Sequence, residues 1–177
     1  AMNGNRLPVS ITHYYNSCDS DKDEFGMGYG WRTSLHQTLH KVLYNGEVEF
    51  VYTDGDGTEH FFKKNKDDQK KYSDQSGLSL TLEVGDENIT ITDKGDNVMT
   101  FPLVSDTPTE DAPETAKVLI QKIQDAVGNE VTVTALADSP LKIASVTDGA
   151  NRVTTLHYTD GRCDRIQTPW QDEKNCV

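Results

Sequence analysis

The chain has 177 residues, with 29 acidic and 17 basic side chains and a formal net charge of −12. This acidity argues against binding nucleic acid or an anionic membrane surface, because both interactions require basic patches. No run of 18 apolar residues occurs, so no membrane insertion is expected. The hydrophobic content of 34% favours thin sheets with much exposed surface.

The length suits one domain or one piece of a larger protein. Ala1 and Met2 are interpreted as a vector remnant ahead of an excised fragment. The rest divides into an N-terminal β-hairpin region at 3–102, an acidic, proline-containing loop at 103–117, and repeated hairpins at 118–177. The acidic composition fits a secreted or cell-surface protein.

Three cysteines, Cys18, Cys163 and Cys176, allow at most one disulfide. Cys163 and Cys176 are the closest pair in sequence and therefore the candidates for a bridge. The spacing contains no C-x-x-C pair, and no metal or other cofactor is expected from it.

The alternation of apolar and polar residues over 7–17 predicts a half-buried strand. An acidic turn follows, in which Asp19, Asp21 and Asp23 resemble the opening of a calcium loop. Glu24 stands where that loop needs glycine, and Gly30 stands where it needs a bidentate Glu. We therefore favour a solvated acidic turn and keep the three aspartates only as weak calcium candidates.

The segment 25–31 alternates three glycines with Met27 and Tyr29, between Phe25 and Trp31. Glycine permits backbone angles and close approaches that a Cβ forbids. The preferred interpretation is a sharp bend with Trp31 as a core anchor, since large aromatic side chains bury extensive area. The alternative is an aromatic surface in which Trp31, Tyr29 and Trp170 stack on glycans.

Asn45 and Gly46 separate two alternating runs, which is the strongest short hairpin pattern. A two-residue turn sets Tyr44 opposite Glu47 and places Leu39 opposite Tyr52. A helix over 33–43 is the competing interpretation, and the turn outweighs it.

Further hairpins are predicted up to residue 101. A turn at 54–58 leads into a short strand, and the charged residues 63–74 are expected to form a solvated loop. Alternating leucines from Leu78 predict the next strand. Asp93 and Gly95 lie in the turn between the last two strands of this region.

Residues 103–117 contain or adjoin three prolines and offer little to bury, so a mobile loop is expected. A strand resumes at 118–123, and strand–turn–strand units then repeat. Asp can fold back on the turn backbone, while Gly and Asn accept left-handed angles. The turn residues of these units are Asp125, Gly128, Asn129, Asp148, Asn151 and Gly161. The predicted fold is all-β, with antiparallel hairpins side by side in a curled, open sheet or partial shell.

Residues 120–131 and 141–162 resemble RHS repeats, also called YD repeats, whose pattern runs roughly I-x-D-x-x-G-N-x-x-x-x-x-Y-x-x-x-G-R-L-x-x-I. Ala150 fills the usual glycine position and Cys163 replaces the usual leucine. The segments 7–17 and 28–31 are similar to the region that precedes such repeats. The residues that fall on the repeat pattern are Asp148, Asn151, Tyr158, Gly161, Arg162 and Ile166.

The resemblance implies a large secreted or wall-associated protein, often bacterial, whose hairpins coil into a continuous sheet. In polymorphic toxins of this family the sheet forms a shell around a C-terminal effector, and in wall-associated relatives the repeats are linked with carbohydrate. The implied partners are the remainder of the same polypeptide and surface glycans.

No Gly-x-Ser-x-Gly or His-Glu-x-x-His motif occurs. His36 and His40 would lie about 13 Å apart on a strand, too far apart to share a metal ion. The leading hypothesis is a non-catalytic structural segment, and the alternative is a carbohydrate-binding module. An enzyme is the third hypothesis, which a pocket containing a histidine with a nucleophile or two acids would favour.

Overall fold

The computed structural model describes residues 10–169, and this part of the chain forms two antiparallel sheets, of thirteen strands and of two. The predicted all-β fold is therefore confirmed. A 3-10 turn at Ser17–Asp19 precedes β2, and the described residues contain no helix long and apolar enough to cross a membrane. The strands are β1 (His13–Tyr15), β2 (Trp31–Thr33), β3 (Thr38–Tyr44), β4 (Glu47–Thr53), β5 (Glu59–Lys64), β6 (Lys71–Asp74), β7 (Thr81–Val84), β8 (Asn88–Thr92), β9 (Val98–Pro102), β10 (Val118–Leu119), β11 (Lys122–Gln124), β12 (Glu130–Leu136), β13 (Ser139–Thr147), β14 (Val153–Thr159) and β15 (Arg162–Gln167).

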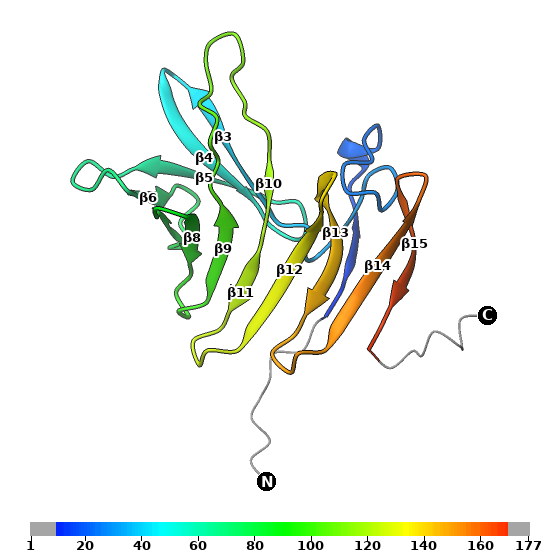
Figure 1. Ribbon diagram of the computed structural model, residues 1–177. Helices are drawn as coiled ribbons and strands as arrows, with labels where there is room; N and C mark the ends of the chain where they lie inside the picture. Colours follow the sequence, from blue (N-terminus) through cyan, green and yellow to red (C-terminus); the bar gives the residue numbers. More distant parts are fainter. Residues whose placement is uncertain (1–9, 170–177) are drawn as a thin grey trace.

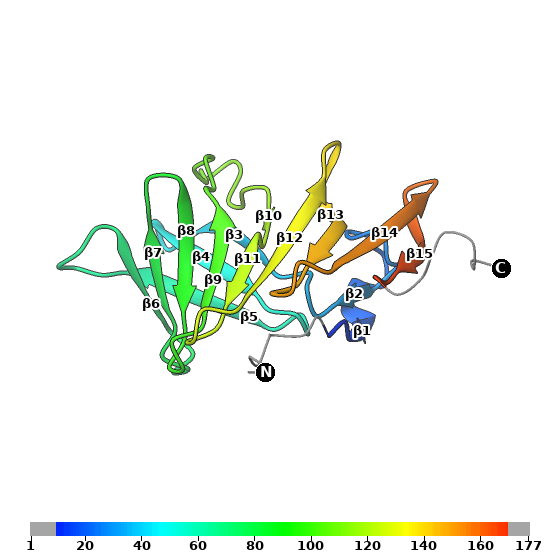
Figure 2. The ribbon, with the colours of Figure 1, turned by 60° about the horizontal axis from the view of Figure 1, so that its bottom comes forward.

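The large sheet runs in chain order from β3 to β9, continues through β11 to β15, and places β10 on the free side of β3. The single strand predicted at 118–123 is therefore wrong. The Ile120 amide donates to the Gln37 carbonyl, and the Gln121 amide donates to the Thr100 carbonyl. One segment thus bonds to both ends of the β3–β9 array. The array curls, while β12 to β15 extend as a flatter arm (Figures 1 and 2).

One continuous hydrophobic core unites the curled part and the arm. Its side chains come from alternate strand positions, as a period of two requires. Burying one large aliphatic or aromatic side chain contributes about 1.5–3 kcal/mol, so hairpins that are unstable alone stabilise one another through this core. Core residues with less than 5% exposure include Leu39, Phe50, Tyr52, Phe62, Leu82, Ile89, Ile91, Phe101, Val131, Val133, Ile143, Val146 and Leu156.

One turn design recurs at five hairpins. After β11, the carboxylate of Asp125 accepts hydrogen bonds from the amides of Val127 (3.0 Å) and Asn129 (2.9 Å), two and four positions along. The residue three positions along, Gly128, has a φ of 90°, which favours glycine, asparagine or aspartate. The other four turns start at Asp54, Asp74, Asp93 and Asp148, with left-handed residues Gly57, Gly77, Asp96 and Asn151.

The Asn45–Gly46 turn has positive φ at both residues, 50° and 78°. These angles suit a two-residue turn whose twist matches the strands. The predicted register of β3 and β4 is confirmed, with Tyr44 opposite Glu47 and Leu39 opposite Tyr52.

The loop predicted at 63–74 is wrong at both of its ends. β5 continues to Lys64, and β6 occupies the last four residues. The ring of Tyr72 packs edge-on against Phe50, with centroids 4.8 Å apart, and this burial holds β6 in the sheet despite its charged neighbours. Likewise, the strand predicted from Leu78 begins only at Thr81.

The segment 103–117 also differs from the expectation that it offers little to bury. Val104 and Pro108 are buried, and the returning half pairs with β3. The Leu43 amide donates to the Pro113 carbonyl (2.8 Å), and the Thr115 amide donates to the Lys41 carbonyl (3.0 Å). This segment therefore extends the sheet beside β3.

Within the N-terminal strand predicted at 7–17, the described part contains only β1, which pairs with β2 in the small sheet. Residues 7–9 of that prediction lie outside the described residues.

Candidate functional site

The glycine-rich stretch buries Phe25 instead of Trp31. Phe25 is 3% exposed, its ring lies 4.6 Å from that of His36, and the Arg32 guanidinium lies 4.9 Å from its centroid. Trp31 is 43% exposed and contacts Tyr15. The interpretation of Trp31 as a core anchor is therefore wrong, because Phe25 fills that position.

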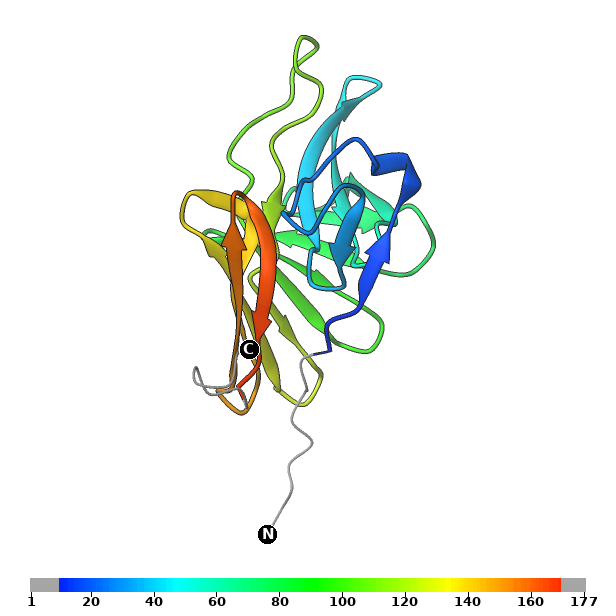
Figure 3. The same cartoon turned by 90° about the vertical axis from the view of Figure 1, so that its right-hand side faces the viewer.

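Gly26 joins this N-terminal segment to the β14–β15 hairpin, which Figure 3 views from the side of the arm. The Gly26 carbonyl accepts a hydrogen bond from the Cys163 amide, and its φ is 71°. A Cβ at this position would lie 2.8 Å from the Gly161 carbonyl oxygen, so only glycine fits. The Asp23 carboxylate also approaches the Arg162 guanidinium, at 3.3 Å. The segment thus covers the start of the outer edge of β15.

A polar cavity of about 250 Å³ lies between this N-terminal segment and the side of β3–β5 that faces away from the core. We call that side the outer face; its residues are His40, Val42, Tyr44, Glu49, Val51, Thr53, Glu59, Phe61 and Lys63. The cavity collects charges of both signs, and Lys117 pairs with Glu24 at 2.7 Å. Its lining consists of Asp19, Lys22, Glu24, Arg32, His40, Val42, Val51, Thr53, Gly57, Glu59, Phe61, Glu114 and Lys117.

Arg32 and His40 are the buried nitrogen groups of this cavity lining, at 7% and 5% exposure. Arg32 Nη2 donates to the His36 carbonyl, whereas Arg32 Nε and His40 Nδ1 have no partner among the described residues. Burial lowers the pKa of Arg32, against Glu24 and other carboxylates that act to raise it. Burial, followed by the charge of Lys117, also lowers the pKa of His40, which is therefore neutral at pH 7. These groups can bind a polar ligand through hydrogen bonds.

An apolar groove of about 780 Å³ continues from the polar cavity along the outer face. The two share Val42, Phe61 and Glu114 in their linings. The groove also takes in Tyr44 and Pro113, and its floor includes Glu49 of the central strand β4. One end of the outer face thus offers charge, and the other offers apolar surface.

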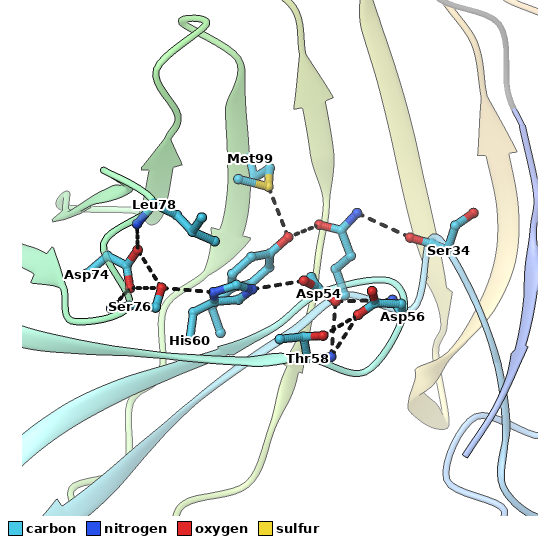
Figure 4. A network of polar contacts seen from close by, with 11 residues as sticks. Ser34, Asp54, Asp56, Thr58, His60, Asp74, Ser76, Leu78 and Met99 are labelled. Carbon is cyan, nitrogen blue, oxygen red and sulfur yellow. Dashed lines mark hydrogen bonds and ion pairs between the residues drawn. The ribbon is translucent and has the colours of Figure 1, made fainter.

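A chain of polar contacts that sequence reasoning missed links the 54–58 and 74–78 turns on the core side of the sheet (Figure 4). His60 Nε2 lies 2.9 Å from Asp54 Oδ2, and His60 Nδ1 lies 3.4 Å from Ser76 Oγ. This is the composition of a catalytic triad, but the Ser76 hydroxyl donates to Asp74 at 2.7 Å within its own turn. Neither His60 nor Ser76 lines the cavity or the groove described above. The geometry therefore ties turns together and does not present a nucleophile.

The enzyme hypothesis needs a histidine with a nucleophile or two acids in one pocket. The polar cavity does bring His40 together with Glu59 and Glu114. Among residues 10–169, however, no acidic side chain forms a hydrogen bond with His40, so this histidine has no acid–base partner within proton-transfer distance in the described cavity.

Of the three predicted glycan residues, Trp31 and Tyr29 lie in the described part of the chain, and each contacts a different neighbour. The rings of Trp31 and Tyr15 lie 5.2 Å apart and are tilted by 46°. Tyr29 is exposed and lies under the Arg162 guanidinium, 5.5 Å from its centroid. Trp170 lies outside the described residues.

The calcium candidates make separate contacts. Asp19 accepts a hydrogen bond from Asn16, Asp23 accepts one from the Gly28 amide, and Asp21 is exposed. Among the described residues, no group of three or more His, Cys, Asp or Glu side chains could hold a metal ion.

The predicted turn residues all lie in turns or at their ends, with one difference in detail. The left-handed residue of the 93–97 turn is Asp96, not Gly95. Cys18 is exposed and Cys163 is half-buried, while Cys176 lies outside the described residues, so a Cys163–Cys176 bridge stays a prediction.

Comparison with protein families gives a match over the N-terminal third of the chain. Residues 1–62 match a protein family described as a domain of unknown function, DUF6531. This region holds eleven of the thirteen residues that line the polar cavity, all except Glu114 and Lys117. No curated protein is significantly similar to the chain.

Proposed function

We propose that this chain is a non-catalytic structural segment of an RHS-type protein that is secreted or held at the cell surface. The observation that carries the proposal is the Asp turn that recurs at five hairpins with the same pattern of amide hydrogen bonds. A hairpin repeat needs such a well-defined turn so that successive hairpins can pair side by side in the sheet.

The residues that match the RHS pattern have structural roles in this chain. Asp148 and Asn151 form a turn, and the Tyr158 hydroxyl donates to the Ile143 carbonyl at 2.8 Å. Arg162 holds Asp23 of the N-terminal segment, and Ile166 packs against the core. None of these residues lines the polar cavity or the apolar groove. The family match over residues 1–62 agrees with a segment placed ahead of the repeats, as the resemblance implies.

The proposed partner is the following part of the same polypeptide, which pairs with β15. Gly26 covers only the start of the outer edge of this strand, at Cys163. Within residues 10–169, no strand pairs with the outer edge of β15 at Arg165 and Ile166. The edge of a sheet at such a position is a template for another strand.

The test compares this chain with a version extended by the residues that follow it in its gene. The proposal predicts slower amide hydrogen exchange at Arg165 and Ile166 in the extended chain, with β4 as an internal control. Unchanged exchange along β15 would refute the proposed continuation of the sheet.

A carbohydrate-binding surface is the second candidate function, and the exposure of Trp31, Tyr29 and Tyr15 favours it. Aromatic faces at the surface can stack on sugar rings. The test is a glycan array with the unmodified chain, Tyr29→Ala and Tyr44→Ala, since both tyrosines are 58% exposed and only Tyr29 lies near Trp31 in sequence. Binding lost in Tyr29→Ala alone supports this function, and an array without any binding rejects it.

A further inference from the structure

The apolar groove on the outer face has apolar side chains along its walls and a carboxylate, that of Glu49, in its floor. Tyr44 and Phe61 line it while remaining 58% and 41% exposed. Pro113 lies on the far side of β3, where the returning half of segment 103–117 bonds to that strand. The groove volume of about 780 Å³ is within the range of ligand sites in proteins. Exposed aromatic side chains beside such a groove are typical anchors for a partner.

The floor carries a buried carboxylate. The side chain of Glu49 is 5% exposed, and Lys63 Nζ, at 3.8 Å, is its only ion-pair partner in the described chain. That distance is too long for a hydrogen bond, and no other donor reaches the Glu49 carboxylate within residues 10–169. The carboxylate keeps little contact with solvent, so a ligand that supplies a cationic donor gains a strong, charge-assisted interaction here. Glu114 adds a second carboxylate to the lining.

We propose that this groove binds a peptide segment of a partner protein in which an arginine or lysine stands between apolar residues. The apolar side chains pack on Val42, Tyr44 and Phe61, and the cationic group reaches Glu49. The choice rests on charge complementarity: the groove offers Glu49 and Glu114 against the single Lys63, in a chain of net charge −12. The net negative charge of the chain also attracts basic segments over long range and so favours their encounter with the groove. The proposal is independent of whether the sheet continues beyond β15.

The probes are four nine-residue peptides that differ only at the central position, which is arginine, lysine, citrulline or glutamate. Two valines or leucines flank the centre on each side, and serine and glycine complete the ends. Citrulline keeps the shape of arginine and removes its charge. Amide chemical shifts of the labelled chain report both the affinity and the site.

We expect the arginine and lysine peptides to shift amides of β3, β4, β5 and Glu114. The citrulline peptide should bind about tenfold more weakly, because a buried charge pair is lost. Glu49→Gln keeps the shape of the side chain and should abolish the difference between arginine and citrulline. Glu83→Gln, at an exposed position of β7, is the matched control and should keep the difference.

Three outcomes would overturn the proposal. These are no binding of either cationic peptide at millimolar concentration, equal affinity for arginine and citrulline peptides, and shifts that map away from the outer face. The spectrum of each variant without peptide establishes that the variant is folded.

Discussion

Asp148→Ala tests the turn design that the account relies on. The Asp148 carboxylate accepts three hydrogen bonds, from the amides of Ala150 (2.8 Å) and Arg152 (3.0 Å) and from Arg152 Nε (2.6 Å). Each hydrogen bond contributes about 1 kcal/mol net. The Arg152 side chain is partly exposed, so its ion pair with Asp148 contributes less to stability than a fully buried pair of this kind would. The variant should therefore lose about 2–3 kcal/mol of unfolding free energy.

Thermal and urea unfolding, followed by circular dichroism, measure this loss. For a domain of this size, it corresponds to a fall in Tm of about 5–10 °C. Asp138→Ala is the matched control, because Asp138 is exposed in the β12–β13 turn, and its effect should stay within about 0.5 kcal/mol. Asp148→Asn keeps one oxygen for the two amides, so its loss of unfolding free energy should lie between those of Asp148→Ala and Asp138→Ala. If Asp148→Ala is no less stable than Asp138→Ala, the argument that the aspartate closes the turn is refuted.

Three further predictions concern pH, backbone geometry and exposure. Burial acts to raise the pKa of Asp148, but the hydrogen bonds from Arg152 and Ala150 outweigh it, so the folded pKa is lowered. The stability that Asp148 contributes is therefore present above about pH 3.9 and is lost as pH falls through the folded pKa. Acid titrations of Asp148→Ala should show a weaker decline in stability than those of the unmodified chain. Gly26→Ala should cost more stability in urea unfolding than Gly77→Ala, because both glycines have positive φ but only Gly26 faces backbone within 3 Å; equal losses would contradict the docking of the N-terminal segment. In a Trp170→Phe background, acrylamide should quench Trp31 fluorescence efficiently, and a protected Trp31 would contradict its 43% exposure.

The turns of this fold could be predicted from the sequence, because each one is determined by residues within the turn itself. Asn45 and Gly46 adopt left-handed angles that few other residues accept, and this fixes the register of β3 and β4. The Asp turns follow from contacts that span only four residues, as at Asp125 and Asn129. Such features need no knowledge of distant neighbours.

The sequence-based predictions were wrong where contacts between segments that are distant in the sequence determine the local structure. Tyr72 joins the sheet through its contact with Phe50, which is 22 positions away, and composition alone suggested a charged loop. The segment 118–124 divides because its two halves bond to different strands. Trp31 is displaced from the core because Phe25 packs against His36.

The candidate site was hidden for the same reason. Glu49 alternates with core residues of β4 and therefore resembles a solvent-facing position in sequence. Only the fold shows that the outer face of β3–β5 is lined there by Pro113 and Glu114, from more than 60 positions further along the chain. A single sequence carries no pattern that connects these segments.

Native-state hydrogen exchange at increasing urea tests the central claim most directly, since that claim is one continuous sheet with one shared core. We predict that amides of β4 in the curled part and of β12 in the arm exchange with the same unfolding free energy and the same urea dependence, because both contribute to that core. Separate free energies and urea dependences for β4 and β12 would mean two independent units, and would contradict the account.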